Sequence, residues 1–243
     1  MSTTSGEMSF LARIRRLLAG APQEQGEGGS LLARARSSGD PFKSADYFAA
    51  AEPAMDEQWR GLVWPRIGKL DLTRVLDLAA GHGRNSAKLR DVAGTVVIVD
   101  INDECLDACR RRFEGDPRFR YVKTDGATLA GVADASITLV YSFDSMVHFA
   151  PEVVRSYLRE CRRVLVPGGH GFCHHSNYTG NPDGDFRASP HWRNHMSREL
   201  FARYCGEAGL DVVRSDVIDW GQPPDFYAGL DCLTVFRKPV PAA

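Results

Sequence analysis

One segment organises this chain, and it reads Val75-Leu76-Asp77-Leu78-Ala79-Ala80-Gly81-His82-Gly83-Arg84-Asn85-Ser86. The pattern predicts a buried strand with Asp77 at its end, then a glycine turn, then the start of a helix. Gly81 and Gly83 remove two side chains from the turn, so a ligand can approach the backbone closely. The unpaired N–H groups at the start of the helix would point at the same space.

A second apolar run, Thr95-Val96-Val97-Ile98-Val99, is closed by Asp100, nineteen residues after Gly81. An acidic side chain at that distance, at the tip of the next strand, suits the hydroxyl pair of a ribose. The pattern therefore predicts a nucleotide-like ligand, but it does not choose between the reactions that use one.

Length and composition predict a globular protein with one α/β domain and an extension. The chain has 243 residues, 43% of them hydrophobic and 25% charged, with a net charge of −1. That charge balance gives no general attraction to nucleic acid, and no apolar run is long enough for stable membrane insertion. The cysteines lie mostly inside apolar segments, so we expect reduced core residues of a cytoplasmic protein. They are Cys105, Cys109, Cys161, Cys173, Cys205 and Cys232.

Residues 1–40 are predicted to be a flexible extension. Residues 9–20 can form a short helix with apolar side chains on one side and arginines on the other. Such a helix either lies on a membrane surface or docks on its own domain or a second subunit. The docking interpretation is favoured because so short a helix binds lipid weakly. Docking on a second subunit would make the protein a homodimer, which stays a possible arrangement. Residues 21–40 are rich in Gly, Gln, Glu and Ser and indicate a linker.

Residues 41–243 are predicted to form the domain itself. Its first part, residues 41–70, carries large apolar side chains that can pack on the core and form a helical lid over the glycine turn. Strands and helices then alternate, which indicates a parallel sheet with helices on both faces. The last two predicted strands, 210–219 and 231–237, are joined without a long helix and can pair antiparallel. The prediction is a doubly wound α/β fold with a mostly parallel seven-stranded sheet and an antiparallel C-terminal strand.

In sum these residues resemble the class I S-adenosylmethionine-dependent methyltransferases, over roughly residues 46–239. The rival interpretation, a nicotinamide-dependent reductase, expects a third glycine where this chain has Ser86. The features that carry the resemblance, in order, are Asp77 with Gly81 and Gly83, then Asp100, Asp125-Gly126, Val164-Leu165-Val166-Pro167-Gly168-Gly169, and the closing strand pair.

The resemblance implies S-adenosyl-L-methionine as the cofactor. The glycine turn would approach its amino-acid part, and Asp100 would bind the ribose hydroxyls. Asp125 would accept a hydrogen bond from the adenine amino group, with Gly126 or Ala127 beside the ring. The cofactor-binding set implied in this way is Asp77, Ala79, Gly81, Gly83, Asn85, Asp100, Ile101, Asp125, Gly126 and Ser142.

Methyl transfer to a hydroxyl usually needs a base, and the candidates follow the fourth and fifth strands. After the fourth strand, Asp144 can hold a substrate hydroxyl, help to hold a metal or cap the next segment. His148 can be a base or a packed connector. The fifth strand ends at His174-His175. Successive strand residues point to opposite faces, so we expect only one of these two to reach the methyl group, as a base or to orient the substrate.

The long irregular segment 176–196 is predicted to be a substrate loop. Tyr178 or Trp192 could stack on a sugar or another flat ring. Arg187 or Arg193 could pair with a carboxylate or phosphate, and Asn177 adds a polar group. His191 and His195 lack a third ligand, so no metal site is predicted.

The sequence therefore predicts a methyltransferase that acts on a small polar acceptor at oxygen. A sugar, a glycan intermediate or a secondary metabolite is the expected acceptor class. Two alternatives stay open: N-methylation of a small amine, and a non-catalytic cofactor-binding partner protein.

Overall fold

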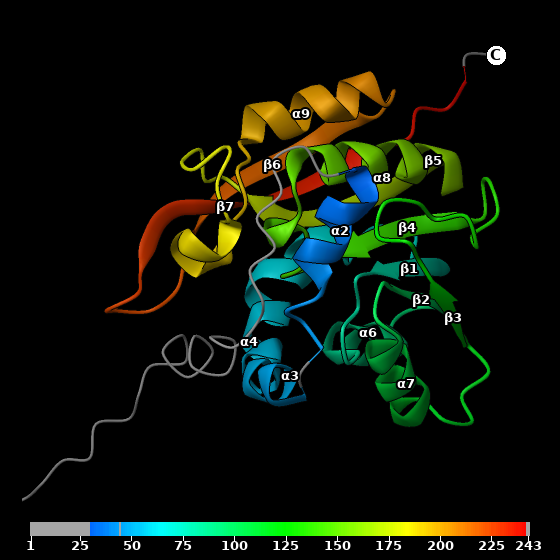
Figure 1. The fold of residues 1–243 in the computed structure, drawn as a ribbon. Helices are drawn as coiled ribbons and strands as arrows, with labels where there is room; N and C mark the ends of the chain where they lie inside the picture. The colour runs from blue at the N-terminus through cyan, green and yellow to red at the C-terminus, as the bar shows by residue number, and fades with distance from the viewer. Residues whose placement is uncertain (1–29, 44, 242–243) are drawn as a thin grey trace, which may run out of the picture.

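The computed structural model describes residues 30–43 and 45–241, and its centre is a seven-stranded sheet in the order β3-β2-β1-β4-β5-β7-β6 (Figure 1). Strand β1 pairs in parallel with β2 and β4, and β5 continues the parallel part beyond β4. Strand β7 lies antiparallel between β5 and β6. This topology confirms the predicted fold. The strands are β1 (Arg74–Leu78), β2 (Thr95–Asp100), β3 (Phe119–Lys123), β4 (Ile137–Ser142), β5 (Leu165–Ser176), β6 (Asp211–Trp220) and β7 (Tyr227–Arg237).

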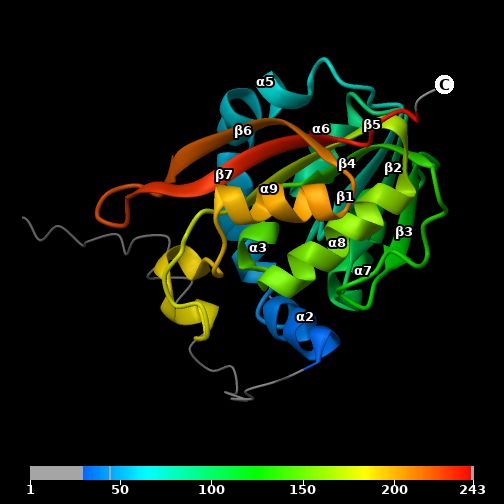
Figure 2. The same ribbon diagram turned by 90° about the horizontal axis from the view of Figure 1, so that it is seen from above.

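Helices cover both faces of the sheet (Figures 1 and 2). Helices α2, α8 and α9 lie on one face, and α5, α6 and α7 lie on the other, so that the sheet is buried between two apolar clusters. The helical segments are α2 (Leu31–Gly39), α3 (Ala45–Ala51), η1 (Glu52–Ala54), α4 (Met55–Gln58), η2 (Trp59–Val63), α5 (Trp64–Ile67), α6 (Arg84–Arg90), α7 (Asp103–Arg112), η3 (Met146–His148), α8 (Pro151–Val164), η4 (Phe186–Ala188), η5 (Pro190–Trp192) and α9 (Arg198–Glu207).

Helix α8 shows how the sequence produces this packing. Val154, Leu158 and Cys161 recur at helical spacing and are fully buried, so one stripe of the helix faces the sheet. Pro151 starts the helix, where its missing N–H costs nothing. All six cysteines are free and buried, as predicted for core residues.

One local prediction is wrong. Residues 31–39 were expected to be linker but form helix α2, because Ser30 caps it by accepting a hydrogen bond from the Ala33 N–H at 3.3 Å, while Ala35 and Ser38 are buried against the domain. Pro167, Gly168 and Gly169 lie within β5, where the pairing with β4 shifts register. The helix predicted at residues 9–20 lies outside the described residues.

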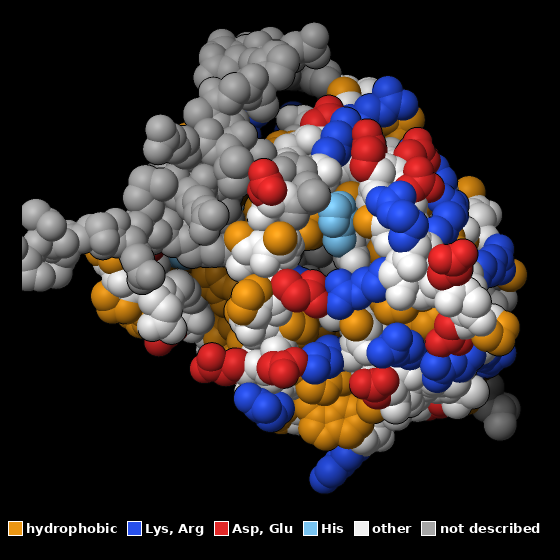
Figure 3. Space-filling model, turned by 90° about the horizontal axis from the view of Figure 1, so that it is seen from below, with side chains coloured by type: hydrophobic (Ala, Val, Ile, Leu, Met, Phe, Trp, Pro, Cys, Tyr) orange, Lys and Arg blue, Asp and Glu red, His pale blue; other side chains and the backbone are white. Residues whose placement is uncertain are grey.

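The segment predicted as a lid forms α3, α4, η2 and α5 along one side of the domain (Figure 1). Within the described residues, no helix has both the length and the apolar character needed to cross a membrane. Figure 3 shows positive and negative side chains interspersed over the face seen from below, without a large patch of one sign.

Candidate active site

A cleft of about 630 Å³ opens at the carboxyl ends of β1, β2 and β4, under helix α2. Its wall includes Gly81 from the glycine turn, Asp100 and Ile101 after β2, and Gly126 after β3. Ligands of open parallel sheets bind at this edge, where the strand order reverses on either side of β1. The cleft therefore lies where the sequence pattern places a nucleotide-like ligand.

The glycine turn is tied to the tip of β2. The Gly81 N–H donates to Oδ2 of Asp100 at 2.9 Å, and Gly81 has φ +57°. A Cβ at Gly81 would lie 2.3 Å from the ring of Phe48 on α3, so the lid helix occupies the space that glycine leaves. Gly83 was expected to make room for a ligand, but a Cβ there would meet Phe113, 2.8 Å away in the core. The role of Gly83 in this structure is therefore packing.

Two buried carboxyl groups differ in their access to the cleft. Asp77 lies beneath it and accepts a 2.6 Å hydrogen bond from Ser86, and burial raises its pKa to about 7. Asp100 lines the cleft, and burial raises its pKa to about 6 although backbone N–H groups of Gly81 and Asn102 donate to it. Asp100 alone of this pair can touch a ligand directly.

The other residues implied for the cofactor divide in the same way. Ala79, Ile101 and Gly126 line the cleft. Asp125 instead turns its carboxylate to its own loop, where it accepts hydrogen bonds from Ala127 and Thr128. Burial raises the pKa of this carboxyl, but these hydrogen bonds outweigh burial, so the pKa is lowered. The residues buried beneath the cleft are Asn85, which accepts a hydrogen bond from Tyr141 at 2.8 Å, and Ser142, whose hydroxyl has no partner among the described residues.

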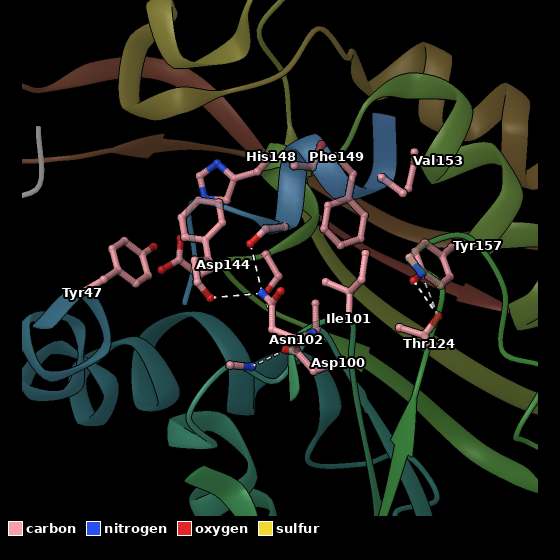
Figure 4. Close-up of a pocket in the computed structure, with 18 of the residues that line it drawn as sticks. Tyr47, Asp100, Ile101, Asn102, Thr124, Asp144, His148, Phe149, Val153 and Tyr157 are labelled. Atoms are coloured by element: carbon pink, nitrogen blue, oxygen red, sulfur yellow. Dashed lines mark hydrogen bonds between the residues drawn. The ribbon is translucent and has the colours of Figure 1, made fainter. Parts of the chain in front are cut away.

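The cleft fits a nucleoside-bearing ligand. Apolar side chains of Ile101, Phe149 and Val153 line the cleft together with Asp100, and Phe149 and Val153 lie further from Asp100 than Ile101 does (Figure 4). A flat base can bind between the apolar groups, while a carboxylate is a good acceptor for sugar hydroxyls.

A second cavity of about 920 Å³ lies beside the cleft and shares four wall residues with it. The shared residues are Phe42, Tyr47, Asp144 and His148. Figure 4 shows Tyr47, Asp144 and His148 at one end of the cleft. Two ligands bound in the two cavities would therefore meet at these side chains, an arrangement that suits a two-substrate transfer reaction.

His148 has one ring nitrogen engaged and one without a partner. Nδ1 lies 2.8 Å from the carbonyl oxygen of Trp192, which can only accept, so Nδ1 carries the proton. Nε2 is buried without a hydrogen-bond partner among the described residues. Burial, together with the charge of Arg193, lowers the pKa of His148 to about 4. His148 is therefore a neutral imidazole whose Nε2 lone pair is buried and unpartnered among the described residues, at the junction of the two cavities.

Asp144 occupies a strained backbone position at the same junction. Its φ is +57°, in the left-handed region that non-glycine residues rarely adopt. Its carboxylate accepts from Arg84 at 2.6 Å, and its N–H donates to Nδ1 of His174 at 3.2 Å. Strained residues of this kind cluster at ligand sites.

His174 and His175, the preferred base candidates from the sequence, lie outside both cavities. Both are fully buried. His174 accepts from the Asp144 N–H and donates through Nε2 to Asp231 at 3.0 Å, so its two nitrogens are engaged. His175 points to the other face, where it stacks on Phe201 and lies 2.9 Å from Thr234. Neither offers a free nitrogen to a substrate, and the catalytic prediction for them is not supported by this geometry.

The substrate loop contributes two of its predicted residues to the second cavity, Trp192 and Arg193. Arg193 is buried and pairs with Asp231 at 2.6 Å, so its charge is neutralised within the protein. Three predicted residues lie elsewhere. Asn177 bonds to backbone groups, Arg187 pairs with Asp185, and Tyr178 lies outside both cavity walls. Among the described residues, no group of three potential metal ligands comes together.

Several wall residues had no signal in the sequence. Arg84 follows the glycine turn but points across to Gln58 and Asp144, and Phe42 comes from the segment after α2. Trp220 ends β6, an edge strand with no expected role. An aromatic residue at a strand end is a weak signal by itself, so only the fold identifies these positions.

A methyltransferase-domain family matches residues 75–169, from β1 to the start of β5. A demethylmenaquinone methyltransferase of Clavibacter sepedonicus is 35% identical over 114 residues. That match covers 47% of this chain and 45% of the relative, so the chain matches less than half the length of that protein.

Solved structures share the fold over most of the chain. A S-adenosylmethionine-dependent methyltransferase of Leishmania major superposes with a TM-score of 0.62 and 16% identity, covering 85% of this chain and 80% of that one. The [4+2]-cyclase SpnF superposes with a TM-score of 0.60 and 15% identity, covering 96% and 93%. At such identities the likeness concerns the fold, and the reaction must be argued from the site.

Proposed function

Because this chain belongs to the class I S-adenosylmethionine-dependent methyltransferase family, we propose that it is an enzyme that methylates a small acceptor at a hydroxyl oxygen. The cleft at the strand ends would hold the cofactor, and the second cavity would hold the acceptor. The observation that carries this proposal is the unpartnered, buried Nε2 of His148 between the two cavities.

S-adenosyl-L-methionine would supply an activated methyl group on a sulfonium. Asp100 would accept hydrogen bonds from the ribose hydroxyls, and Ile101 with Gly126 would flank the adenine ring. Ala79 and Gly81 would approach the amino-acid part through the backbone. Asp77, Gly83 and Asn85 would support the turn from below, as their packing and hydrogen bonds indicate.

His148 would act as the general base. An acceptor O–H in the second cavity would donate to Nε2, and that nitrogen would take the proton when the oxygen gains the methyl group, the bond from sulfur to the methyl group breaks and S-adenosylhomocysteine leaves. The carbonyl of Trp192 holds the Nδ1–H tautomer that this role requires. Asp144 would help to orient the acceptor. Because its carboxylate is already paired with Arg84, Asp144 would not bind a cationic acceptor strongly.

The acceptor is proposed to be a hydroxyl of a sugar, a glycan intermediate or a secondary metabolite. The aromatic wall of the second cavity favours the last of these, and the relative named above acts, by its name, on demethylmenaquinone. N-methylation of an amine is less well supported, because Asp144, the carboxylate in the wall of the second cavity, is already paired with Arg84 and is not free to bind an amine. A cytoplasmic location is proposed from the free cysteines, and a homodimer remains a proposal without a contact to support it.

The test is a screen of hydroxyl acceptors for S-adenosylhomocysteine release, with wild type and His148→Gln compared on every acceptor that reacts. Transfer should fall about 100-fold or more in the variant, while cofactor affinity changes little. If His148→Gln releases S-adenosylhomocysteine at the wild-type rate, His148 is not the base. A protein that binds the cofactor but methylates nothing would support the non-catalytic alternative.

A further inference from the structure

The second cavity has the chemistry of a site for a flat, uncharged ring system. Its wall contains four aromatic side chains from four separate segments: Phe42 before α3, Tyr47 on α3, Trp192 at the end of η5, and Trp220 at the end of β6. Phe42 lies 5.0 Å from Tyr47 and 6.0 Å from Trp192, measured between ring centroids. Such rings bind the faces and edges of planar ligands.

The loop backbone is strained in a way that presents Trp192 to this cavity. His191 and Trp192 have φ of +45° and +58°, two successive residues in the left-handed region. Hydrogen bonds on both sides hold them there, from His191 to the Asp225 carbonyl at 2.7 Å and from His148 to the Trp192 carbonyl at 2.8 Å. Strain that persists under such bonding is typical of ligand sites.

The charged groups of the cavity are already neutralised. Arg84 pairs with Asp144 at 2.6 Å, and Arg193 pairs with Asp231 at 2.8 and 2.6 Å while its guanidinium lies 5.1 Å from the Trp220 ring centroid. An anionic acceptor would have to compete with Asp144 and Asp231 for the guanidinium groups, and a cationic one would have to compete with Arg84 for Asp144. A neutral acceptor avoids both costs.

Three polar groups in the wall of the second cavity can form hydrogen bonds with a ligand. Nε2 of His148 can only accept, and Tyr47 adds a hydroxyl whose pKa is raised by burial, so that it stays protonated and can donate. Gln58 uses its carbonyl oxygen for Arg84, which leaves its amide N–H groups as donors. The site can therefore receive one ligand hydroxyl and at least one ligand acceptor atom.

We propose that the second cavity selects an uncharged, planar aromatic hydroxyl compound as the methyl acceptor. This inference rests on the proposed function, which places the acceptor in that cavity. Phe42, Trp192 and Trp220 provide the ring-binding walls, and His148 receives the hydroxyl.

A matched set of probes tests this proposal by titration against the protein saturated with S-adenosylhomocysteine. The set is 2-naphthol, trans-2-decalol, 2-naphthoate, 2-naphthylmethylammonium and methyl glucoside, which separate planarity, charge and sugar character. We expect 2-naphthol to bind with a Kd about tenfold or more below that of every other probe. Equal or tighter binding of any other probe would overturn the proposal.

Two variants place the binding in the cavity. Trp192→Leu and Trp220→Leu should each weaken 2-naphthol about five- to tenfold, whereas Trp64→Leu, a half-exposed tryptophan outside the cavity wall, should not. Equal affinities in all three would overturn the proposal. If either cavity variant fails to fold, as judged by circular dichroism, the order of probe affinities for the wild-type protein tests the proposal by itself.

Cofactor binding is measured separately, so the two failures can be told apart. Calorimetry that shows S-adenosyl-L-methionine binding, together with no preference for 2-naphthol, overturns the acceptor class and leaves the proposed function standing. No cofactor binding overturns the proposed function, and the acceptor inference falls with it.

Discussion

The Nδ1 atom of His148 lies 2.8 Å from the carbonyl oxygen of Trp192, forty-four residues further along the chain. This contact joins the residue proposed as the base to the loop proposed to bind the acceptor. It sets the imidazole tautomer, so Nε2 is left as a lone-pair acceptor at the meeting point of two cavities. A loop that moves would therefore alter the base and the acceptor site together.

The first prediction concerns the pH dependence of transfer. The neutral imidazole is the active form, and the pKa of His148 is about 4 in the folded protein. The value of kcat/KM should therefore stay constant as pH falls from about 8 to about 5, and should decline only below that. An ordinary histidine would instead cause a decline around pH 6.5.

The measurement is S-adenosylhomocysteine release across that pH range under second-order conditions. His148→Gln serves as the control, because any decline that it retains has another origin. An inflection of the wild-type profile at about pH 6.5 would contradict a buried, neutral base.

The second prediction concerns the buried carboxyl of Asp77. Its pKa is about 7 when folded against an unfolded value of 3.8. The folded state therefore binds more protons between these values, so this group contributes stability at acid pH that is lost as pH rises towards 7. Asp77→Asn removes the titration but keeps an oxygen that can accept from Ser86.

Denaturant unfolding of both proteins, without cofactor, measures this effect. The stability of wild type relative to Asp77→Asn should fall by up to about 4 kcal/mol between about pH 4 and about pH 8. A difference that is independent of pH would show that Asp77 is ionised throughout.

The third prediction concerns Gly81. An alanine there would have φ +57° and a Cβ 2.3 Å from Phe48, so the lid helix must move. We expect a loss of about 1–2 kcal/mol from the backbone alone, and weaker cofactor binding from the displaced lid. Gly115→Ala is the matched control, because φ is +76° there but no atom lies within 4 Å of the added Cβ. Stability by thermal unfolding and affinity by calorimetry should separate the two variants; equal affinity in both would mean that Phe48 does not matter to the cleft.

The fourth prediction concerns the buried pair of Arg193 and Asp231. Both side chains are almost fully buried, and Asp231 also accepts from His174. Asp231→Asn should cost about 3–5 kcal/mol, because it leaves the Arg193 charge uncompensated. Asp211→Asn, in an exposed pair with Arg237, should cost no more than about 1 kcal/mol. Comparable costs in urea unfolding would mean that Arg193 finds water or another partner.

The parts of the fold that follow from local pattern were predictable. The run from Val75 to Leu78, the glycine turn and Asp100 are periodic or positional signals, and each appears where the sequence indicates. Helix α2 was missed because its apolar content is low and its stability comes from packing over the cleft.

The histidines show why the site was harder to predict than the fold. Two adjacent histidines at the end of β5 suggest catalysis, but their partners Asp231 and Thr234 come from β7, nearly sixty residues away. Only the antiparallel register of β5 and β7 brings them together. The pairing of Arg84 with Asp144 is of the same kind, since sixty residues separate the two side chains.

The central claim is that the cleft beside the glycine turn holds S-adenosyl-L-methionine through Asp100. Calorimetric titration of wild type, Asp100→Ala and Asp103→Ala tests it, because Asp103 is an exposed acid on α7 outside the cleft wall. We predict binding to wild type and Asp103→Ala with similar affinity, and binding at least about tenfold weaker to Asp100→Ala, consistent with the loss of hydrogen bonds to a charged acceptor. No binding to wild type, or equal binding to all three proteins, would contradict the account.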